Sequence, residues 1–474
     1  MAQDNALKFN KFLITSNSQK EEEGKDKGKY KTVDLRGSGN PIIEYRESVF
    51  MPFVEITAYI IDTGNTLPAD DGTGAGVGLL DGGFGQGTEM IQFGMEDIMG
   101  NKINFLGRDD LRVASVKGDF QGFKNDTFML KIVSKEAFDN TLLKNRCGTE
   151  EDSSKFSGKI SAIARTVVRK NLKSSKASSM NTDETLNEWH GFGEDKTPFE
   201  MLLMLQKLAI PNIQTSKGKT SKGNTAGYLF FQTANGYQFK SLDKLFETKE
   251  NNTKDGNGRK IRRYIENSRS DEGLPASFDG KILWSNMSRS VDALSQFESG
   301  AWSSKVIVFN DGTKEINERT LQSEGTGNGI TGGSHLPLLN KEYLDSDDKP
   351  LPTTQYVIRQ AAGQTIKGLD TLEQQVEKAG DINYNNEDIY LQAHQNYRQK
   401  MSISAEIIVE ADLSLNAGDL IYCEFPELST KVTPIGSRTR KSGIYMIADL
   451  CHYGTVANSF TGLHLVRDSF GVKT

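Results

Sequence analysis

Cysteine, proline and long apolar runs are all scarce in this chain, and each shortage excludes a class of protein. The 474 residues include three cysteines, Cys147, Cys423 and Cys451, which are too few and too scattered for a disulfide framework. This favours synthesis in a reducing cytoplasm. Eleven prolines against forty-six glycines favour turns and hairpins over rigid linkers.

No apolar run approaches the roughly 20 residues that a membrane-spanning helix needs, so we expect no membrane insertion. The first residues, Met1 to Lys11, are polar and lack the apolar core of a signal peptide, so we expect the chain not to be exported on its own. The formal net charge is −6 and the pI is about 5.6, whereas phosphate-binding proteins are usually basic. Composition and length instead favour a soluble, loop-rich protein of about three domains.

The seventy residues from Met401 to Phe470, near the C-terminus, carry the clearest strand pattern. Apolar residues recur at every second position from Met401 to Ala411, which predicts a strand with one buried face. Leu415 to Asp419 is a turn sequence, and Leu420 to Phe425 is a short run ended by Pro426. Gly443 to His452 and Phe460 to Val466 then predict a hairpin. Four short strands without an intervening helix favour an antiparallel barrel.

The N-terminal third predicts a second group of strands. Ile42 to Asp62 is rich in β-branched and aromatic residues around Pro52, which predicts an edge, a bulge and a strand over Val54 to Asp62. Further strands are expected over Phe9–Ser16, Glu89–Phe93, Lys102–Phe105, Arg112–Asp119 and Asp126–Ser134. Together they predict a first barrel.

Helical periodicity enters in the middle of the chain. Gly158 to Leu172 predicts an amphipathic helix, and Thr197-Pro198-Phe199-Glu200 is a capping box that opens a second helix through Leu208. Gly227 to Leu242 then predicts a hairpin with an Asn-Gly turn, the strongest short hairpin signal.

The remaining segments are less regular. We expect a polar loop over Lys249–Arg263, a helix from Ile282 onward ended by Gly300, and a strand over Lys305–Asn310. Arg319–Pro352 lacks apolar periodicity and is expected to be exposed and mobile, and Glu387–Lys400 is expected to be a polar helix.

No motif in the sequence supports a catalytic, cofactor or metal site. Gly218-Lys219-Thr220 is like a phosphate loop, but Ile213 stands where that motif needs glycine. Cys451 and His452 are adjacent on a strand and point to opposite faces, so with Cys423 and His464 they are expected to be packed strand residues rather than metal ligands. His190 is interpreted as a loop or packing residue. The carboxylates Asp292, Glu298 and Asp311 form no acid/base pair.

Three blocks of sequence resemble the baseplate central hub proteins of contractile-tailed bacteriophages. The most specific is Tyr228-Leu229-Phe230-Phe231 followed by Gly236 to Leu242. The others are the closing hairpin, Ser442–His452 with Thr461–Asp468, and the Leu415–Ile421 turn. Similar lead-in and capping segments occur at Tyr45–Asp62 and Thr197–Glu200, while Gly72–Gly87 and Arg319–Pro352 match nothing in that family.

This resemblance implies a mainly β fold with α insertions, in which two tail-tube-like antiparallel β-barrels carry a small helical domain inserted in the first. The implied domains are a first barrel over 1–147, completed by 225–247, and an inserted helical domain over 148–224. A loop-rich segment with a helix and strands of the second half covers 248–385. A helix and the closing strands of the second barrel cover 386–474.

The resemblance also implies a structural virion protein with no enzymatic activity, located in the tail baseplate after assembly in the host cytoplasm. The expected assembly is a homotrimer that adapts a three-fold central spike to a six-fold tail tube around the DNA and tape-measure channel. Its expected partners are the spike, the tail tube proteins and other baseplate subunits, with the tape-measure protein as a further candidate and genomic DNA only as passing cargo. Two alternatives stay open: a tail-associated cell-wall hydrolase, which a zymogram on bacterial cell walls would reveal, and a receptor-binding β protein.

Overall fold

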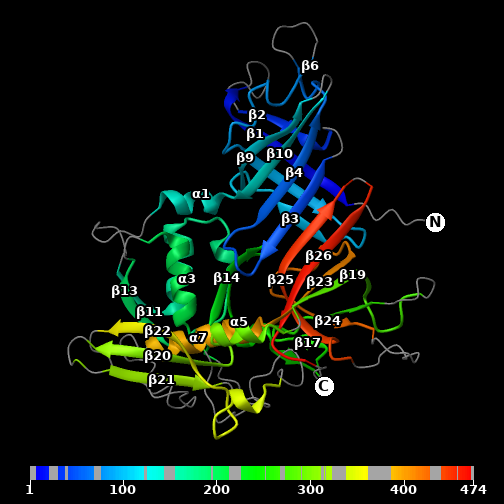
Figure 1. Cartoon of the computed structure of the whole chain (residues 1–474). Coiled ribbons are helices and arrows are strands. Elements are labelled where there is room, and N and C mark those ends of the chain that lie inside the picture. The colour runs from blue at the N-terminus through cyan, green and yellow to red at the C-terminus, as the bar shows by residue number, and fades with distance from the viewer. Residues whose placement is uncertain are drawn as a thin grey trace.

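The computed structural model confirms a mainly β chain with helical insertions (Figure 1). It describes residues 7–20, 30–37, 41–68, 76–121, 125–143, 155–193, 196–212, 226–250, 252–266, 273–289, 291–310, 314, 316–322, 338–360, 386–426, 439–455 and 457–470. Most of the strands belong to one large sheet that runs through both the N-terminal and the C-terminal half of the chain.

Six strands of the C-terminal half close into a barrel. Around the barrel they are β18 (Arg262–Ile265), β19 (Gly280–Arg289), β23 (Ile403–Glu410), β26 (Ser459–Arg467), β25 (Gly443–Gly454) and β24 (Leu420–Glu424), which pairs again with β18. The closing strand β18 runs parallel to both of its neighbours, whereas all other pairings are antiparallel. The expected barrel is therefore present, but it is not purely antiparallel.

The N-terminal half is a six-stranded antiparallel sheet with two short extensions. In spatial order the strands are β1 (Lys8–Lys20), β7 (Met90–Glu96), β9 (Leu111–Gln121), β10 (Asp126–Ser134), β4 (Glu55–Asp62) and β3 (Ile42–Ser48). β2 (Tyr30–Asp34) pairs with β1, β8 (Lys102–Phe105) pairs with β7, and β5 (Leu67–Pro68) pairs with β6 (Gly76–Val77). Among the described residues β1 does not pair with β3, so this half is an open counterpart of the barrel.

The strand β25 joins the two halves into one sheet. One edge of β25 pairs with β26 along most of its length. The other edge is divided: Gly443–Met446 pairs with β24, and Asp449–Gly454 pairs with β3 of the first half. Between these two ladders lies a bulge at Ala448, whose carbonyl accepts a hydrogen bond from the Val49 amide at 2.9 Å. The first half thus uses its free β3 edge to pair with the second half.

The two halves share one strand order. If the six main strands of each half are numbered one to six along the chain, both sheets run 1–4–5–6–3–2. The halves differ in their first strand, because β1 is antiparallel to its neighbour β7 while β18 is parallel to β24. Such identical winding of two six-stranded units within one chain indicates an internal structural repeat.

The third strands of the two halves also match in sequence. β4 reads Ile56-Thr57-Ala58-Tyr59-Ile60-Ile61, and β23 reads Ile403-Ser404-Ala405-Glu406-Ile407-Ile408. In both, the alanine lies opposite a buried leucine of the sixth strand, Leu130 or Leu465. The repeat therefore extends from strand order to the register of the core-facing residues.

An α/β insertion follows the first sheet. It contains α1 (Lys135–Leu142), β11 (Lys155–Lys159), α2 (Ile160–Thr166), which continues as a π-helix over Val167–Asn171, β12 (Asn181–Thr182), β13 (Glu188–Phe192) and α3 (Pro198–Leu208). The predicted helical segments are confirmed, and β11 pairs with β13 beside them. The capping box is complete: the Glu200 amide donates to the Thr197 hydroxyl and the Thr197 amide donates to the Glu200 carboxylate at 2.7 Å.

This cap gives a small testable effect. Thr197→Ala removes the hydroxyl that accepts the Glu200 amide, and we expect a loss of about 1 kcal/mol in the free energy of unfolding. Denaturant titration checks this value, with Thr197→Ser as the matched control that keeps the hydroxyl. Equal stability of the alanine and serine variants would contradict the capping role.

The hairpin β14 (Tyr228–Thr233) and β15 (Gly236–Ser241) forms as predicted, but it does not complete the first sheet. Its strands pair with each other, and β15 also pairs with β12, in a separate three-stranded sheet. The hairpin instead contacts the end of the first half through side chains, because the Val54 amide donates to the Gln232 carbonyl oxygen at 3.2 Å. α4 (Leu242–Leu245) and the short pair β16 (Thr248–Lys249) and β17 (Lys254–Asp255) follow.

A second insertion separates β19 from β23. It contains α5 (Ala293–Glu298), β20 (Ser303–Asn310), β21 (Ile316–Gln322), a 3-10 turn at Lys341–Tyr343, β22 (Thr353–Gln360) and α7 (Asn386–Lys400). The predicted strand and polar helix are confirmed at β20 and α7. The other expectations are corrected: β18 begins inside the predicted loop, the segment from Ile282 is strand up to Arg289, and Arg319–Gln322 belongs to β21. Residues 323–337 lie outside the described residues.

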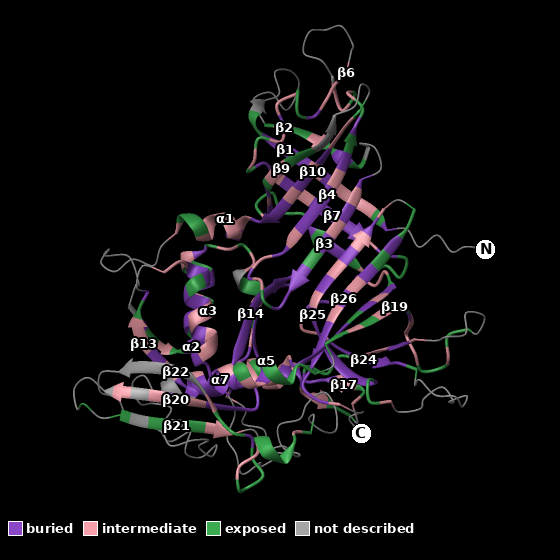
Figure 2. Ribbon diagram, in the orientation of Figure 1, coloured by how far each residue is buried: buried purple, intermediate pink, exposed green. Residues whose placement is uncertain are grey.

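One core runs through both halves of the large sheet. It includes Phe12, Tyr45 and Phe93 from the first half and Ile407, Tyr445 and Leu465 from the second. Figure 2 shows the alternation of buried and less buried residues along β25 and β26. Ile444, Met446 and Ala448 are buried on the other side of β25, under the hairpin and α4, while Leu450 is in the main core. Their alternate positions in the sequence predict that Ile444, Met446, Ala448 and Leu450 line one buried face. This prediction is wrong for Leu450, because the bulge at Ala448 shifts the alternation.

Candidate functional site

The outer face of the large sheet is a single surface that crosses both halves. One row of cross-strand neighbours on this face begins at Trp284 on β19 and crosses five further strands. Its residues are, in order, Ile408 (β23), Gly462 (β26), Cys451 (β25), Arg46 (β3) and Glu55 (β4). Because successive strands in this row are hydrogen bonded without a break, the face is rigid over six strands. We call this surface, from β19 to β10, the shared face.

Apolar side chains are half exposed on the shared face. Trp284 is 48% exposed and Phe460 is 38% exposed, and Ile408, Tyr453 and Tyr59 are partly exposed. Gly462, the cross-strand neighbour of Ile408, has no side chain to cover them. An apolar surface that extends over several strands marks a contact site for another protein.

The charges on the shared face are locally paired. Arg46 contacts Glu44 at 2.6 Å, Lys131 contacts Glu55 at 2.8 Å, and the His464 ring contacts Asp449 at 2.8 Å. These pairs leave no cationic stripe of the kind that tracks a phosphate backbone. The face therefore suits protein contacts better than tight nucleic-acid binding.

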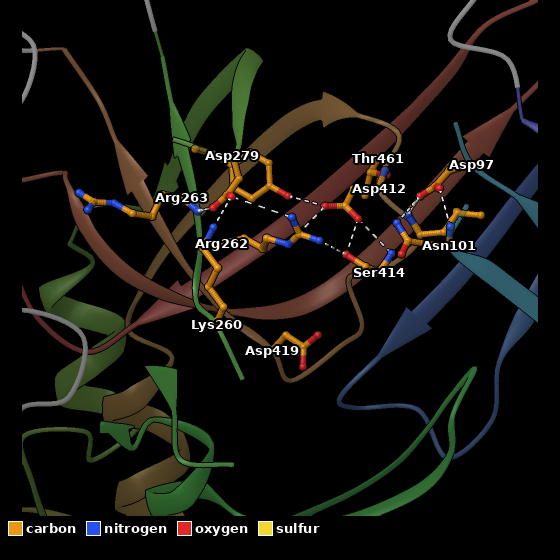
Figure 3. Close-up of polar contacts among 12 residues, drawn as sticks. Asp97, Asn101, Lys260, Arg262, Arg263, Asp279, Asp412, Ser414, Asp419 and Thr461 are labelled. Carbon is orange, nitrogen blue, oxygen red and sulfur yellow. Dashed lines mark hydrogen bonds and ion pairs between the residues drawn. The ribbon is translucent and has the colours of Figure 1, made fainter. Parts of the chain in front are cut away.

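A polar network fixes the position of the β7–β8 turn against the second barrel (Figure 3). The Asp97 carboxylate accepts hydrogen bonds from the Asn101 amide at 2.8 Å and from the Leu413 amide of the second half at 2.9 Å. Nearby, Asp412 accepts from the Tyr264 hydroxyl at 3.0 Å, and its own amide donates to the Thr461 hydroxyl at 3.1 Å. The Leu413–Asp97 bond joins the two halves, and the bonds of Asp412 hold the segment just before Leu413 in place within the second half.

A second buried carboxylate, Glu47, links three segments where the two halves and the hairpin meet. Glu47, at 2% exposure, accepts hydrogen bonds from the Tyr45 hydroxyl at 2.7 Å, the Ala234 amide at 2.6 Å and the Ala417 amide at 2.9 Å. Burial raises the pKa of Glu47 to about 7, and the neighbouring Asp419 adds to this increase. Glu47 thus connects β3, the hairpin turn and the turn that precedes β24.

The cysteines and histidines of the barrel are divided between its core and the shared face. Cys423 and His452 are buried in the barrel, whereas Cys451 and His464 lie on the shared face. The His452 ring stacks on Tyr45 with centroids 6.0 Å apart, and burial lowers its pKa to about 4. Within the described residues no group of three or more His, Cys, Asp or Glu side chains could hold a metal ion.

The other sequence candidates are also dispersed. The His190 ring contacts the Ser157 hydroxyl at 2.9 Å on the small sheet of the first insertion. Asp292 caps α5 by accepting the Ser295 amide at 3.1 Å, and Glu298 is exposed at the end of that helix. Gly218-Lys219-Thr220, Asp311 and Cys147 lie outside the described residues. The structure brings none of the described candidates together as an acid/base pair.

Sequence reasoning missed the shared face and Glu47. The face is defined by the pairing of β3 with β25, which joins positions about 400 residues apart in the chain and has no local signal. Glu47 did have a signal: it continues the inward alternation of Ile43 and Tyr45, so a carboxylate falls on the core side of its strand. Phe460, an aromatic residue at an outward position of its strand, gave a weaker signal for the shared face.

No described helix has the length and apolar character needed to cross a membrane. No known protein-family model matches the sequence. No curated protein matches it either.

Solved structures with similar folds do exist. The 43 kDa tail protein of prophage MuSo2 from Shewanella oneidensis has 12% identity over 98% of each chain and a TM-score of 0.46. The tail protein from Neisseria meningitidis MC58 has 8% identity over 97% of this chain and 96% of that one, with a TM-score of 0.47.

A third structure is the E. coli c3393 protein, described as a component of the type VI secretion system with structural similarity to the T4 bacteriophage tail proteins gp27 and gp5. It has 8% identity over 92% of this chain and 76% of that one, with a TM-score of 0.40.

Proposed function

We propose that this chain is a structural virion protein, the central hub of a phage tail baseplate. The observation that carries the proposal is the repeat of one strand order in two halves that share a sheet. Three copies of a chain with two equivalent β units would present six such units in a ring. Such a ring would match a six-fold tail tube on one side and a three-fold spike on the other.

The sequence resemblance supports the same function. The hairpin block from Tyr228 to Leu242, the Leu415–Ile421 turn and the closing hairpin all fall where the two halves and the hairpin meet. Glu47 contacts two of these blocks, through Ala234 and Ala417. The blocks that resemble the hub family are thus the ones that hold the repeated units together.

The shared face supports a structural role in contact with other proteins. Its half-exposed apolar residues suit the tail tube, the spike or the tape-measure protein as partners, and its paired charges would let DNA pass without tight binding.

The test is a structure of the assembled particle in which this chain is identified by a label. We expect three copies at the centre of the baseplate, between spike and tube, with the six-stranded units arranged around the channel. One copy per particle, six identical chains in the ring, or a position on the tail fibres would each refute the hub function. A peptidoglycan zymogram of the purified chain is expected to show no clearing.

A further inference from the structure

The second insertion carries an exposed apolar patch that no described segment covers. Leu294 on α5 is 71% exposed, Val291 is 44% exposed, and Tyr343 and Leu351 are 49% and 44% exposed. These residues form one patch because the Phe297 ring of α5 lies 5.6 Å from the Tyr343 ring and the Leu351 amide donates to the Tyr343 carbonyl at 3.0 Å. We call it the α5 patch.

Polar side-chain atoms without partners are buried on α5 and just after it. The Gln296 side chain is 6% exposed, and neither its amide nitrogen nor its carbonyl oxygen has a hydrogen-bond partner. The Trp302 indole nitrogen is likewise buried and without a partner. Because these atoms are buried, a second molecule would contact only the apolar and acidic side chains outside them.

The rim of the α5 patch is acidic and has a fixed shape. Residues 291–300 and 338–351 contain six acidic side chains and two lysines, which gives a net charge of −4. The Asp345 carboxylate accepts the Lys349 and Asp347 amides at 2.9 Å each, so the loop holds Asp347 and Asp348 outward in one conformation. The surface that binds here should therefore be basic.

The first insertion of the same chain carries such a surface. Residues 159–176 contain six Lys or Arg side chains and no Asp or Glu. Four of them, Arg165, Arg169, Lys170 and Lys173, are exposed along α2 and its π-helical continuation. Among the described residues no ion pair joins these four to any carboxylate. We call this surface the basic α2 face.

We infer that the α5 patch of one copy binds the basic α2 face of a second copy. The two surfaces differ and lie on different insertions, which is the arrangement that lets identical chains close into a ring. Their opposite charges would steer copies into this orientation, and burial of Leu294 and Tyr343 would supply the apolar contact. The inference rests on the proposed ring assembly and names the contact that closes it.

A charge exchange on the full chain tests this contact. The first variant carries Arg165→Glu, Arg169→Glu and Lys170→Glu. The second carries Glu342→Lys, Asp347→Lys and Asp348→Lys. We expect each variant to weaken self-association at least about tenfold in sedimentation velocity, or about 1.4 kcal/mol. Combining all six changes should restore association, because the opposite charges then meet again.

The matched control reverses three exposed cations of the first sheet, Lys102, Arg108 and Lys117, and should associate like the parent. Restored association in the variant that combines all six substitutions distinguishes a direct contact from damage to folding. A parent chain that stays monomeric at every concentration would overturn the inference, as would variants that associate like the parent or a combination that restores nothing. None of these results refutes the hub function, which only the position of the chain in the particle decides.

Discussion

Met446→Asp is expected to leave little soluble, folded protein. Met446 is fully buried on β25, with Leu420 and Val466 as its cross-strand neighbours. A carboxylate at this position would have no cation or hydrogen-bond donor to pair with, and burying an unpaired charge costs several kcal/mol. Since a typical domain is stable by only about 5–15 kcal/mol, this change consumes much of the total.

The measurement is the soluble yield followed by thermal unfolding of whatever is recovered. Tyr453→Asp is the matched control, because Tyr453 is on the same strand but partly exposed on the shared face. We expect the control to be soluble and to melt close to the parent. A Met446→Asp protein that expresses and melts like the parent would show that this side of β25 is not buried.

The stability of the parent protein is expected to fall as the pH rises from about 5 to 7.5, and Glu47→Gln should remove most of this fall. The folded-state pKa of Glu47 is about 7, against 4.5 for the free side chain. The folded protein therefore holds the proton more tightly than the unfolded chain in this window. By linkage, the free energy of unfolding decreases as the pH rises through it, by about 3 kcal/mol in total.

Urea titrations of both proteins at a series of pH values measure this slope. The range from pH 6 to 7.5 is the most informative, because Asp419, whose pKa burial raises to about 6, titrates mainly below it. Glu44→Gln is the control, since Glu44 is on the same strand but lies on the shared face beside Arg46. If the Glu47→Gln protein keeps the slope of the parent, Glu47 is not the group responsible.

Local signals in the sequence predicted most of the strands and helices. The Asn-Gly hairpin, the Thr197 capping box and the alternation over Ile403–Val409 each follow from a few neighbouring residues, and each is present in the structure. β18 was missed because Arg262-Arg263-Tyr264-Ile265 is short, half charged and forms only short parallel ladders, the longer of them with the distant strand β24. β19 was mistaken for part of a helix because its outer positions lack a clear alternation.

The arrangement of these elements was less predictable than the elements themselves. The pairing of β3 with β25 and the separate sheet of the hairpin depend on contacts between residues far apart in the chain, for which no local pattern exists. The bulge at Ala448 illustrates the same limit, since one extra residue moved Leu450 to the opposite face. The acidic net charge is evident from the composition. The complementary charges of the two insertions became visible only once the exposed residues were known.

Because one edge of β25 pairs with both β24 and β3, the chain can gain or lose residues only away from these ladders. Both insertions leave the large sheet at ends of β10 and β19, away from the ladder between β25 and β3. The connection between the second and third strands spans only residues 49–54 in the first half, whereas in the second it spans residues 290–402. Whole segments can therefore be gained, lost or exchanged at these points while the ladder stays uninterrupted. One rigid frame could in this way acquire new partners through its insertions without being rebuilt.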